Sequence, residues 1–481
     1  MINLKKENIR KVILAILFVL ILVVIALFIG RFTYSYLGPA PTDELTGTGE
    51  VTPSGDTIIF SKGNDLSLSA STDNFHTGSG NLTDTTNPQV RLIASSDTNN
   101  ASTTYYAGIR IYENTYTYSS GTTAELILSV YDENGTLLEA SSDELSFVEV
   151  GGVKGFDITG KTGAYNIAID HPISTTSSTN GTTHTWTFTL TFVNLDTDQS
   201  INETANLNME VVLQKDRIEM PTIEDICSDD ANSRLLACHV LSQYTGTDGE
   251  NGLYYHDADL ANGAEDNSYR YAGATPNNYV CFGSDASTCP SDNLYRIIGV
   301  FDNKIKLIKN SSLGNYAWDS EWDNTWSTSD IKNTLNTTYL NTLSSTWQNK
   351  IATQTWYVGG YSTAEATPKT FYNAERSGPT WVGKIGLMYL SDYGYAISNS
   401  YWTTNLIDYD SATSSNWLYL GDYEWTITPD SDSGTVFFLP NNGKPNSSAY
   451  LDFGARPVFY LNSNVSYVSG DGTQSNPFRI N

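Results

Sequence analysis

The chain has 481 residues, more than one ordinary domain of about 100–150 residues. It carries 26 Lys and Arg against 53 Asp and Glu, a net charge of −27 at pH 7, and only 16% of its residues are charged. Such an acidic chain repels phosphate backbones and anionic lipid headgroups, which argues against nucleic-acid binding and peripheral membrane binding.

A basic segment followed by an uncharged apolar run opens the chain. Residues 1–11 hold four basic side chains, and residues 12–30 hold no charged one. As a helix, that run spans about 28 Å, close to the hydrocarbon core of about 30 Å. Because only Arg31 follows it directly, we predict a single-pass protein in the cell membrane, with a cytoplasmic tail at 1–11, a transmembrane helix at 12–30 in contact with the lipid bilayer, and an extracellular remainder. A cleaved signal peptide is the competing interpretation.

A linker and a strand-rich segment come next. Residues 31–56 contain three prolines and no periodicity, which predicts an extended extracellular linker. Within residues 57–215, runs such as AGIRIYENTYTY and THTWTFTLTFVNL alternate apolar and polar residues. This alternation predicts an all-β, immunoglobulin-like sandwich. Asn134-Gly135 lies between two apolar runs and predicts a β-hairpin.

The character of the sequence changes after the strand-rich segment. Residues 216–250 predict a helical connector, with a helix start at Thr222. Residues 251–481 predict an α+β domain in which LYRIIGVFDNKIKLIKN forms a hairpin about Asp302-Asn303. A helix is expected from a cap at Ser327, through apolar residues at helical spacing.

All four cysteines lie within 63 residues, at Cys227, Cys238, Cys281 and Cys289. In an exported segment they favour disulfides, and pairing of sequence neighbours is our preferred assignment among three connectivities. A zinc site is the alternative, but no Cys-x-x-Cys spacing occurs.

The histidines are scattered and show no metal-binding pair, so we predict no metal and no cofactor. His256, beside Asp257 and Asp259, comes nearest to a catalytic or metal cluster, although a polar loop is the favoured interpretation. Residues 195–203 and 428–436 resemble the start of a calcium loop without its closing glutamate. No motif of a hydrolase, metalloprotease or nucleotide-binding enzyme occurs, and we predict a protein that is not an enzyme.

Tryptophan is concentrated late in the chain, with nine of ten after residue 300. An indole face stacks on a sugar ring, and neighbouring carboxylates and amides bond its hydroxyls. Candidate ligand-binding residues are therefore Trp318, Trp322, Trp326, Trp402 and Trp417. Core packing is the alternative, since a stripe of tryptophans on a helix is more often buried than exposed.

Several segments in order carry a resemblance. GLYYHDADLANGAEDNSYRYAGATPNNYVCFGS, LYRIIGVFDNKIKLIKN, WSTSDIKNTLNTTYLNTLSSTWQNKIATQTWYVGG, NWLYLGDYEWTITP and ARPVFYLNSNVSYVSGDGTQSNPFRI together resemble an uncharacterised surface-protein family of low-GC Gram-positive bacteria. The closing pattern, a Trp-Leu segment followed by RPVFYL, also resembles C-type lectin-like and formylglycine-generating-enzyme-like domains. The resemblance implies a lectin-like fold used for binding. It does not carry over the activity, because that enzyme needs a cysteine pair near its C-terminal half, and residues 290–481 contain none.

These observations predict a membrane-anchored bacterial cell-surface protein in which a β-sandwich stalk presents an adhesion or ligand-binding module. The expected partner is an extracellular ligand, a glycan or a surface protein. The first alternative is a structural subunit of a surface or biofilm fibre, and the second is a formylglycine-generating-like enzyme. In the C-terminal segment, we expect Arg456 to pair with a buried carboxylate.

Overall fold

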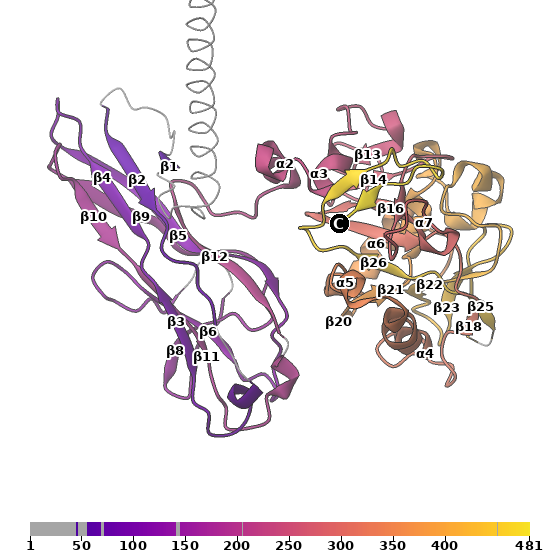
Figure 1. Ribbon diagram of the computed structural model, residues 1–481, viewed down its shortest axis with the longest axis horizontal. Helices are drawn as coiled ribbons and strands as arrows, with labels where there is room; N and C mark the ends of the chain where they lie inside the picture. Colours follow the sequence, from indigo (N-terminus) through magenta and orange to yellow (C-terminus); the bar gives the residue numbers. More distant parts are fainter. Residues whose placement is uncertain (1–44, 47–54, 69–71, 141–144, 204, 450) are drawn as a thin grey trace, which may run out of the picture. The chain divides into compact units, whose positions relative to one another are not determined.

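The computed structural model describes residues 45–46, 55–68, 72–140, 145–203, 205–449 and 451–481, which belong to two compact units that divide between Met220 and Pro221 (Figure 1). The cytoplasmic tail and the transmembrane helix predicted for residues 1–30 lie outside the described residues, as does most of the predicted linker. Within the described ranges, no helix combines the length and the apolar character needed to cross a bilayer.

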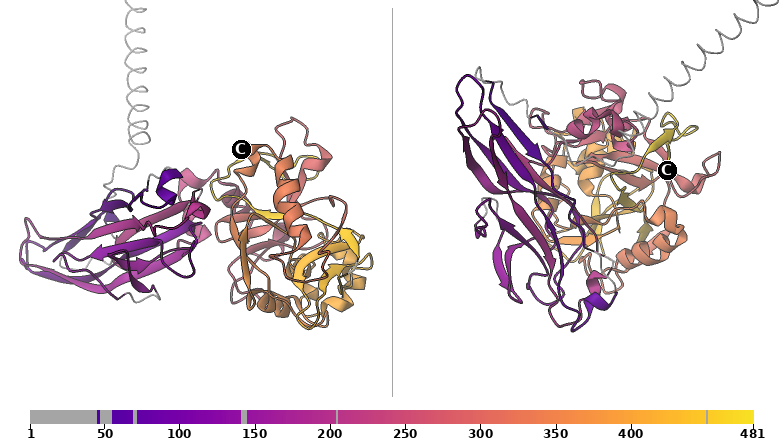
Figure 2. Two further views of the ribbon diagram at one scale, coloured as in Figure 1. Left: turned by 90° about the horizontal axis from the view of Figure 1, so that it is seen from below. Right: turned by 60° about the vertical axis from the view of Figure 1, so that its left-hand side comes forward.

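The N-terminal unit is built from β-strands that run side by side along it (Figure 2). Three antiparallel sheets have the orders β1-β2-β4-β10, β3-β11-β6-β8-β7 and β12-β5-β9. The strands are β1 (Leu45–Thr46), β2 (Thr57–Ser61), β3 (Leu82–Thr86), β4 (Gln89–Ile93), β5 (Ala101–Asn114), β6 (Leu126–Tyr131), β7 (Phe147–Val150), β8 (Val153–Asp157), β9 (Gly163–Thr175), β10 (Thr182–Thr185), β11 (Thr187–Phe192) and β12 (Leu207–Gln214), with 3₁₀ turns η1 (Thr72–Phe75) and η2 (Ser200–Asn202).

Alternation along the strands places the core between these sheets. In β5, Tyr105, Ala107 and Ile109 are fully buried, whereas Arg110 turns the other way and pairs with Glu210 at 2.6 Å. Buried residues of all three sheets join one hydrophobic cluster. Each large apolar side chain buried in this way contributes roughly 1.5–3 kcal/mol. The prediction of an all-β N-terminal unit is confirmed.

The predicted hairpin at Asn134-Gly135 is only partly correct. The turn itself forms, because the Asp132 carboxylate accepts the backbone N–H groups of Asn134 and Thr136 at 2.9 and 2.8 Å. Beyond it, pairing is limited to a single bridge at Leu137. β6 pairs with β11 along its length, and β8 pairs with it at Ile127 and Leu128.

The C-terminal unit centres on a sheet of order β13-β14-β16-β17-β26-β21, with β15 paired to β16. A second sheet has the order β18-β25-β22-β23-β24, and two short ladders are β19-β20 and β27-β28. The strands are β13 (Leu253–Tyr255), β14 (Tyr269–Tyr271), β15 (Tyr279–Cys281), β16 (Leu294–Phe301), β17 (Lys304–Lys309), β18 (Asn315–Ala317), β19 (Gln354–Tyr357), β20 (Thr380–Gly383), β21 (Ile385–Gly386), β22 (Glu424–Pro429), β23 (Val436–Leu439), β24 (Asn446–Ser448), β25 (Asp452–Gly454), β26 (Val458–Tyr460), β27 (Tyr467–Ser469) and β28 (Arg479–Ile480).

The predicted hairpin about Asp302-Asn303 is confirmed, because β16 and β17 pair directly across it. Short helices complete the unit, which is mostly β. They are α2 (Ile223–Ser228), α3 (Leu236–Leu241), α4 (Asp330–Asn333), α5 (Ser345–Gln348), α6 (Pro368–Arg376) and α7 (Leu390–Tyr395), the π-helical turn η6 (Thr334–Tyr339), and the 3₁₀ turns η3 (Asp230–Asn232), η4 (Glu250–Gly252), η5 (Ser291–Asn293), η7 (Leu340–Thr342), η8 (Asn399–Tyr401) and η9 (Leu406–Ser415).

Helices α2 and α3 belong to the C-terminal unit, which corrects the expectation of a separate connector at 216–250. The expected start is right: Thr222 caps α2 through a reciprocal capping box with Asp225. Ile223 and Leu236 are buried in the same hydrophobic cluster as the central sheet. The Leu236 N–H also donates to the carbonyl oxygen of Val465, at 2.9 Å. The two helices are therefore part of the C-terminal core.

The helix expected from Ser327 is only partly correct. The cap is Ser329, whose hydroxyl accepts the Lys332 N–H, and the helical path runs through α4, η6 and η7. It ends at Leu343, which has an extended backbone, before α5 begins. Ile331, Leu335 and Tyr339 are buried on one face of this path, as the helical spacing predicts, and Trp347 is buried from the separate helix α5.

Candidate functional site

Four of the five predicted tryptophan platforms are buried, which corrects the expectation that they bind a ligand. Trp318, Trp326 and Trp402 are 1% exposed and Trp417 is 4% exposed. The indole N–H groups of Trp318, Trp402 and Trp417 donate to backbone carbonyls at 3.2, 3.2 and 2.7 Å. These four residues pack the core, the alternative that the sequence left open.

Trp322 is the exception among the five. Its exposed fraction is 61%, and its backbone has a φ of 63°. A bulky residue with positive φ is a conformational outlier that costs on the order of 1–3 kcal/mol. Backbone preference therefore does not favour a tryptophan here. Strain of this kind is concentrated at ligand-binding and switch regions.

The loop that carries Trp322 is anchored on both sides. Trp318 and Trp326 flank it and contact each other with ring centroids 5.8 Å apart. The Asn324 side chain donates to three carbonyl oxygens in the turn between β22 and β23, at 2.7–3.2 Å. The Ser320 N–H donates to the Asp330 carboxylate at 2.9 Å. Hydrogen bonds from Ser320 lower the pKa of Asp330, so this contact is present at neutral pH.

The acidic residues around Trp322 differ in their roles. Asp319 accepts the Glu321 N–H at 2.7 Å, and Asp323 accepts the N–H and hydroxyl of Thr325 at 3.2 and 3.0 Å. These carboxylates shape the loop, while Glu321, which precedes Trp322 in the sequence, is exposed. An exposed indole can stack on a sugar ring, and an exposed carboxylate on the same hydrogen-bonded loop can accept hydrogen bonds from its hydroxyls. The loop is therefore a candidate sugar-binding site.

His256 has a structural role. It is fully buried, and its Nδ1 accepts the Ala264 N–H at 3.0 Å. Burial, helped by the nearby Arg270, holds its pKa well below the ordinary value of 6.5. Asp257 instead accepts the backbone N–H groups of Asp259 and Leu260 within its own loop. The structure therefore does not assemble a catalytic cluster from the residues around His256.

A buried network, defined here as Asp266, Arg270, Lys306 and Asp392, was missed by the sequence reasoning. Lys306 Nζ lies 2.6 Å from Asp392 Oδ2, and Arg270 Nη2 lies 2.5 Å from Asp266 Oδ2. Arg270, Lys306 and Asp392 have side chains 1–2% exposed. Burial lowers the pKa of Lys306 to about 8, although Asp392 opposes the shift. Because these charged side chains are largely buried and paired with one another, we interpret the network as structural.

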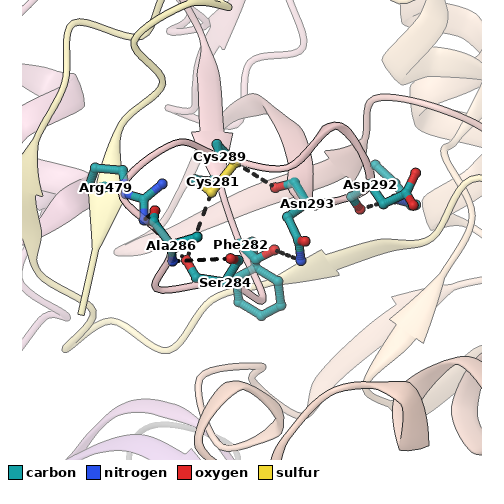
Figure 3. The surroundings of a disulfide bond; sticks show 9 residues. Cys281, Phe282, Ser284, Ala286, Cys289, Asp292, Asn293 and Arg479 are labelled. Atoms are coloured by element: carbon teal, nitrogen blue, oxygen red, sulfur yellow. Dashed lines mark hydrogen bonds between the residues drawn. A yellow bond between two sulfur atoms is a disulfide. The ribbon is translucent and has the colours of Figure 1, made fainter.

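The cysteines form two disulfides, Cys227–Cys238 and Cys281–Cys289, the pairing of sequence neighbours that we preferred. All four being bonded, the cysteine zinc site is ruled out. Figure 3 shows Arg479, from the last strand, donating to the carbonyl oxygen of Ala286 at 2.5 Å inside the loop that the second disulfide closes.

The prediction that Arg456 holds a buried carboxylate is confirmed. Its guanidinium donates through two nitrogens to the two oxygens of Glu424, and both side chains are at most 3% exposed.

One group of potential metal ligands does assemble, contrary to the expectation that the histidines offer no pair. This histidine cluster consists of Glu133, His171 and His184, whose ligand atoms all lie within 4.8 Å of one another. Burial lowers the pKa of His184, which favours the neutral imidazole. Because the three residues lie on separate elements of the fold, spacing in the sequence carries no signal of their proximity.

Comparisons of the chain with models of protein families, with curated proteins and with solved structures found no match. The geometry of these sites is therefore what guides a functional assignment.

Proposed function

We propose that the protein is a membrane-anchored bacterial cell-surface protein, not an enzyme, that binds an extracellular glycan through the Trp322 loop. The observation that carries this proposal is a strained and largely exposed tryptophan on a loop anchored by buried neighbours. Two disulfides support an oxidising, extracellular location. The apolar run at 12–30 supports anchorage in the membrane with the N-terminus in the cytoplasm.

The finer fold assignment belongs to the same proposal. Three antiparallel sheets around one core support an immunoglobulin-like sandwich for the N-terminal unit. For the C-terminal unit, late strand β26 pairs with β17 in the central sheet, which supports a lectin-like arrangement used for binding. A formylglycine-generating-like enzyme is less well supported, because it would need reactive cysteines and all four are bonded to one another.

Glycan binding by the purified full-length chain tests the proposal. We expect Trp322→Ala to weaken binding roughly tenfold or more, as truncation of a central aromatic anchor does. Trp322→Phe keeps an aromatic face and should retain part of the affinity. Val468→Ala is the matched control, because Val468 is 56% exposed in the same unit. A chain that binds no glycan on an array, or an unchanged affinity of Trp322→Ala, contradicts the proposal.

A second variant separates loss of binding from loss of structure. Trp322→Gly removes the indole and also relieves the positive φ, since glycine adopts this conformation readily. We expect it to bind as weakly as Trp322→Ala, while its free energy of unfolding exceeds that of Trp322→Ala by about 1 kcal/mol, because both variants lack the indole and only glycine adopts the positive φ readily. Denaturant unfolding of the full-length chain measures that difference. A destabilised Trp322→Gly variant would show that the indole has a packing role.

A further inference from the structure

Each residue of the histidine cluster comes from a different sheet of the N-terminal unit. Glu133 lies in the turn after β6, in the five-stranded sheet, His171 lies in β9, in the three-stranded sheet, and His184 lies in β10, in the four-stranded sheet. We propose that Glu133, His171 and His184 bind a divalent transition-metal ion, zinc, which ties the three sheets together. This proposal is independent of the glycan proposal.

The distances suit such an ion. His171 Nε2 lies 2.9 Å from Glu133 Oε2, and His184 Nδ1 lies 3.9 Å from the same oxygen. Tetrahedral zinc, with bonds of about 2.0–2.1 Å, places its ligand atoms about 3.4 Å apart. The three side chains therefore reach a zinc geometry through movements on the order of 1 Å. Their exposures of 12–20% leave the site sheltered but open to an ion from solvent.

The backbone of β9 contains a β-bulge next to His171. Between the pairs Tyr105↔His171 and Ala107↔Ala168, β9 has one residue more than β5, which makes a β-bulge directly before His171. Asp170 in the bulge has a φ of 49°. Bulges re-aim side chains and are over-represented beside functional sites. The bulge thus sets the direction of the His171 side chain.

Two buried aromatic residues form a hydrogen-bonded chain that ends at His184. The Trp186 indole N–H, which can only donate, bonds the Tyr105 hydroxyl oxygen at 2.8 Å. The Tyr105 hydroxyl lies 2.9 Å from His184 Nδ1 and donates to it when that nitrogen carries no proton. An ion bound at Nδ1 would use the single in-plane lone pair of this nitrogen and so displace its hydrogen bond with Tyr105.

The donor set identifies the class of ion. Two imidazole nitrogens and one carboxylate oxygen suit zinc and neighbouring transition metals, with a fourth position for water. Calcium needs six to eight oxygen ligands and is not expected to bind.

A metal cross-link would stabilise the N-terminal unit where disulfides do not. Every cysteine of the chain lies at position 227 or later, and the described residues up to 220 contain none.

Zinc titration of the chelator-treated, full-length chain tests the proposal. We expect saturable binding of one zinc ion per chain by calorimetry. At a hundredfold excess over the dissociation constant, the unfolding transition of the N-terminal unit should move up by roughly 5–10 °C. Calcium at the same concentration should produce neither effect. A chain that binds no zinc, or binds it without any shift in unfolding, overturns the proposed cross-link.

Variants assign the binding to these residues. His184→Ala and Glu133→Gln should each abolish the stoichiometric site. His76→Ala is the matched control, because His76 Nε2 lies 3.8 Å from Glu203 Oε1 in the same unit, with no third metal ligand among the described residues. Circular dichroism of each metal-free variant checks folding. Visible absorption of the cobalt-loaded chain provides a second readout, and an unchanged spectrum in His184→Ala refutes the assignment.

Discussion

The buried network and the histidine cluster are both groups of charged or titratable side chains, but they differ in closure. Arg270, Lys306 and Asp392 in the buried network are 1–2% exposed and face one another, and Asp266, at 17%, is the network's most exposed member. The side chains of the histidine cluster are 12–20% exposed, and their three ligand atoms all lie within 4.8 Å of one another. A closed group of opposite charges stabilises one conformation, whereas a sheltered but accessible group of ligands can receive an ion.

The largest expected effect comes from opening the buried network. Asp392→Asn removes the charge opposite Lys306 Nζ, 2.6 Å away, and leaves a buried cation without its partner. We expect the C-terminal unit to lose about 3–5 kcal/mol of stability. Chemical denaturation measures the change, and adding Lys306→Met should restore part of it.

An exposed pair of the same length is the control for that variant. Lys369 Nζ also lies 2.6 Å from Glu265 Oε1, but the two side chains are 32% and 49% exposed. Glu265→Gln should therefore change stability by less than about 1 kcal/mol. Equal effects of Asp392→Asn and Glu265→Gln would contradict the structural importance of burial here.

Acid should weaken the same network by a smaller amount. Burial alone would raise the pKa of Asp266, but Arg270 and the hydrogen bonds from Ser268 and Tyr372 outweigh it and hold this pKa below 3.8. The unfolded state consequently binds the proton first, so the stabilisation is complete above pH 3.8 and is lost as the pH falls through the folded-state pKa.

The effect of Asp266 should be on the order of 2 kcal/mol. Unfolding of the C-terminal unit between pH 5 and pH 2 measures it, and Asp266→Asn should flatten the acid limb of the profile. A variant whose stability falls as steeply as that of the parent chain would place the acid sensitivity elsewhere.

The smallest effect is expected in the metal-free histidine cluster. Glu133→Gln keeps an oxygen acceptor for His171, and the pair that it replaces is partly exposed. We expect the N-terminal unit to change by less than about 1 kcal/mol in the absence of metal. Thermal unfolding in chelator measures this. A loss comparable with that of Asp392→Asn would show that the histidine cluster, too, is a closed structural group.

Local features of the fold were accessible from the sequence. The helix start at Thr222 and the hairpin about Asp302-Asn303 depend on neighbouring residues, and both are confirmed. The sequence predicted that Arg456 pairs with a buried carboxylate. It did not identify Glu424 as the partner, because 32 residues separate the two. The helix expected from Ser327 begins two residues later, at the Ser329 cap, and ends at Leu343, where the backbone is extended before α5.

The candidate sites, too, could be predicted only in part from the sequence. Trp318, Trp322 and Trp326 recur every four residues, and nothing in that spacing says which of them is exposed. Burial separates them, since the flanking two enter the core and leave Trp322 at the surface. His171 and His184 lie 13 positions apart, in strands of different sheets, so only the fold brings them to Glu133.

Composition, charge and periodicity by themselves determined the acidic character of the chain, its mostly β architecture and the change in character near residue 220. These properties follow from local preferences and from which residues avoid water, and both can be read along the chain. The tertiary structure decided which tryptophan is exposed, which charges are sealed in the core and which histidines meet. Those outcomes depend on contacts between distant segments, whose geometry is set only when the sheets pack together.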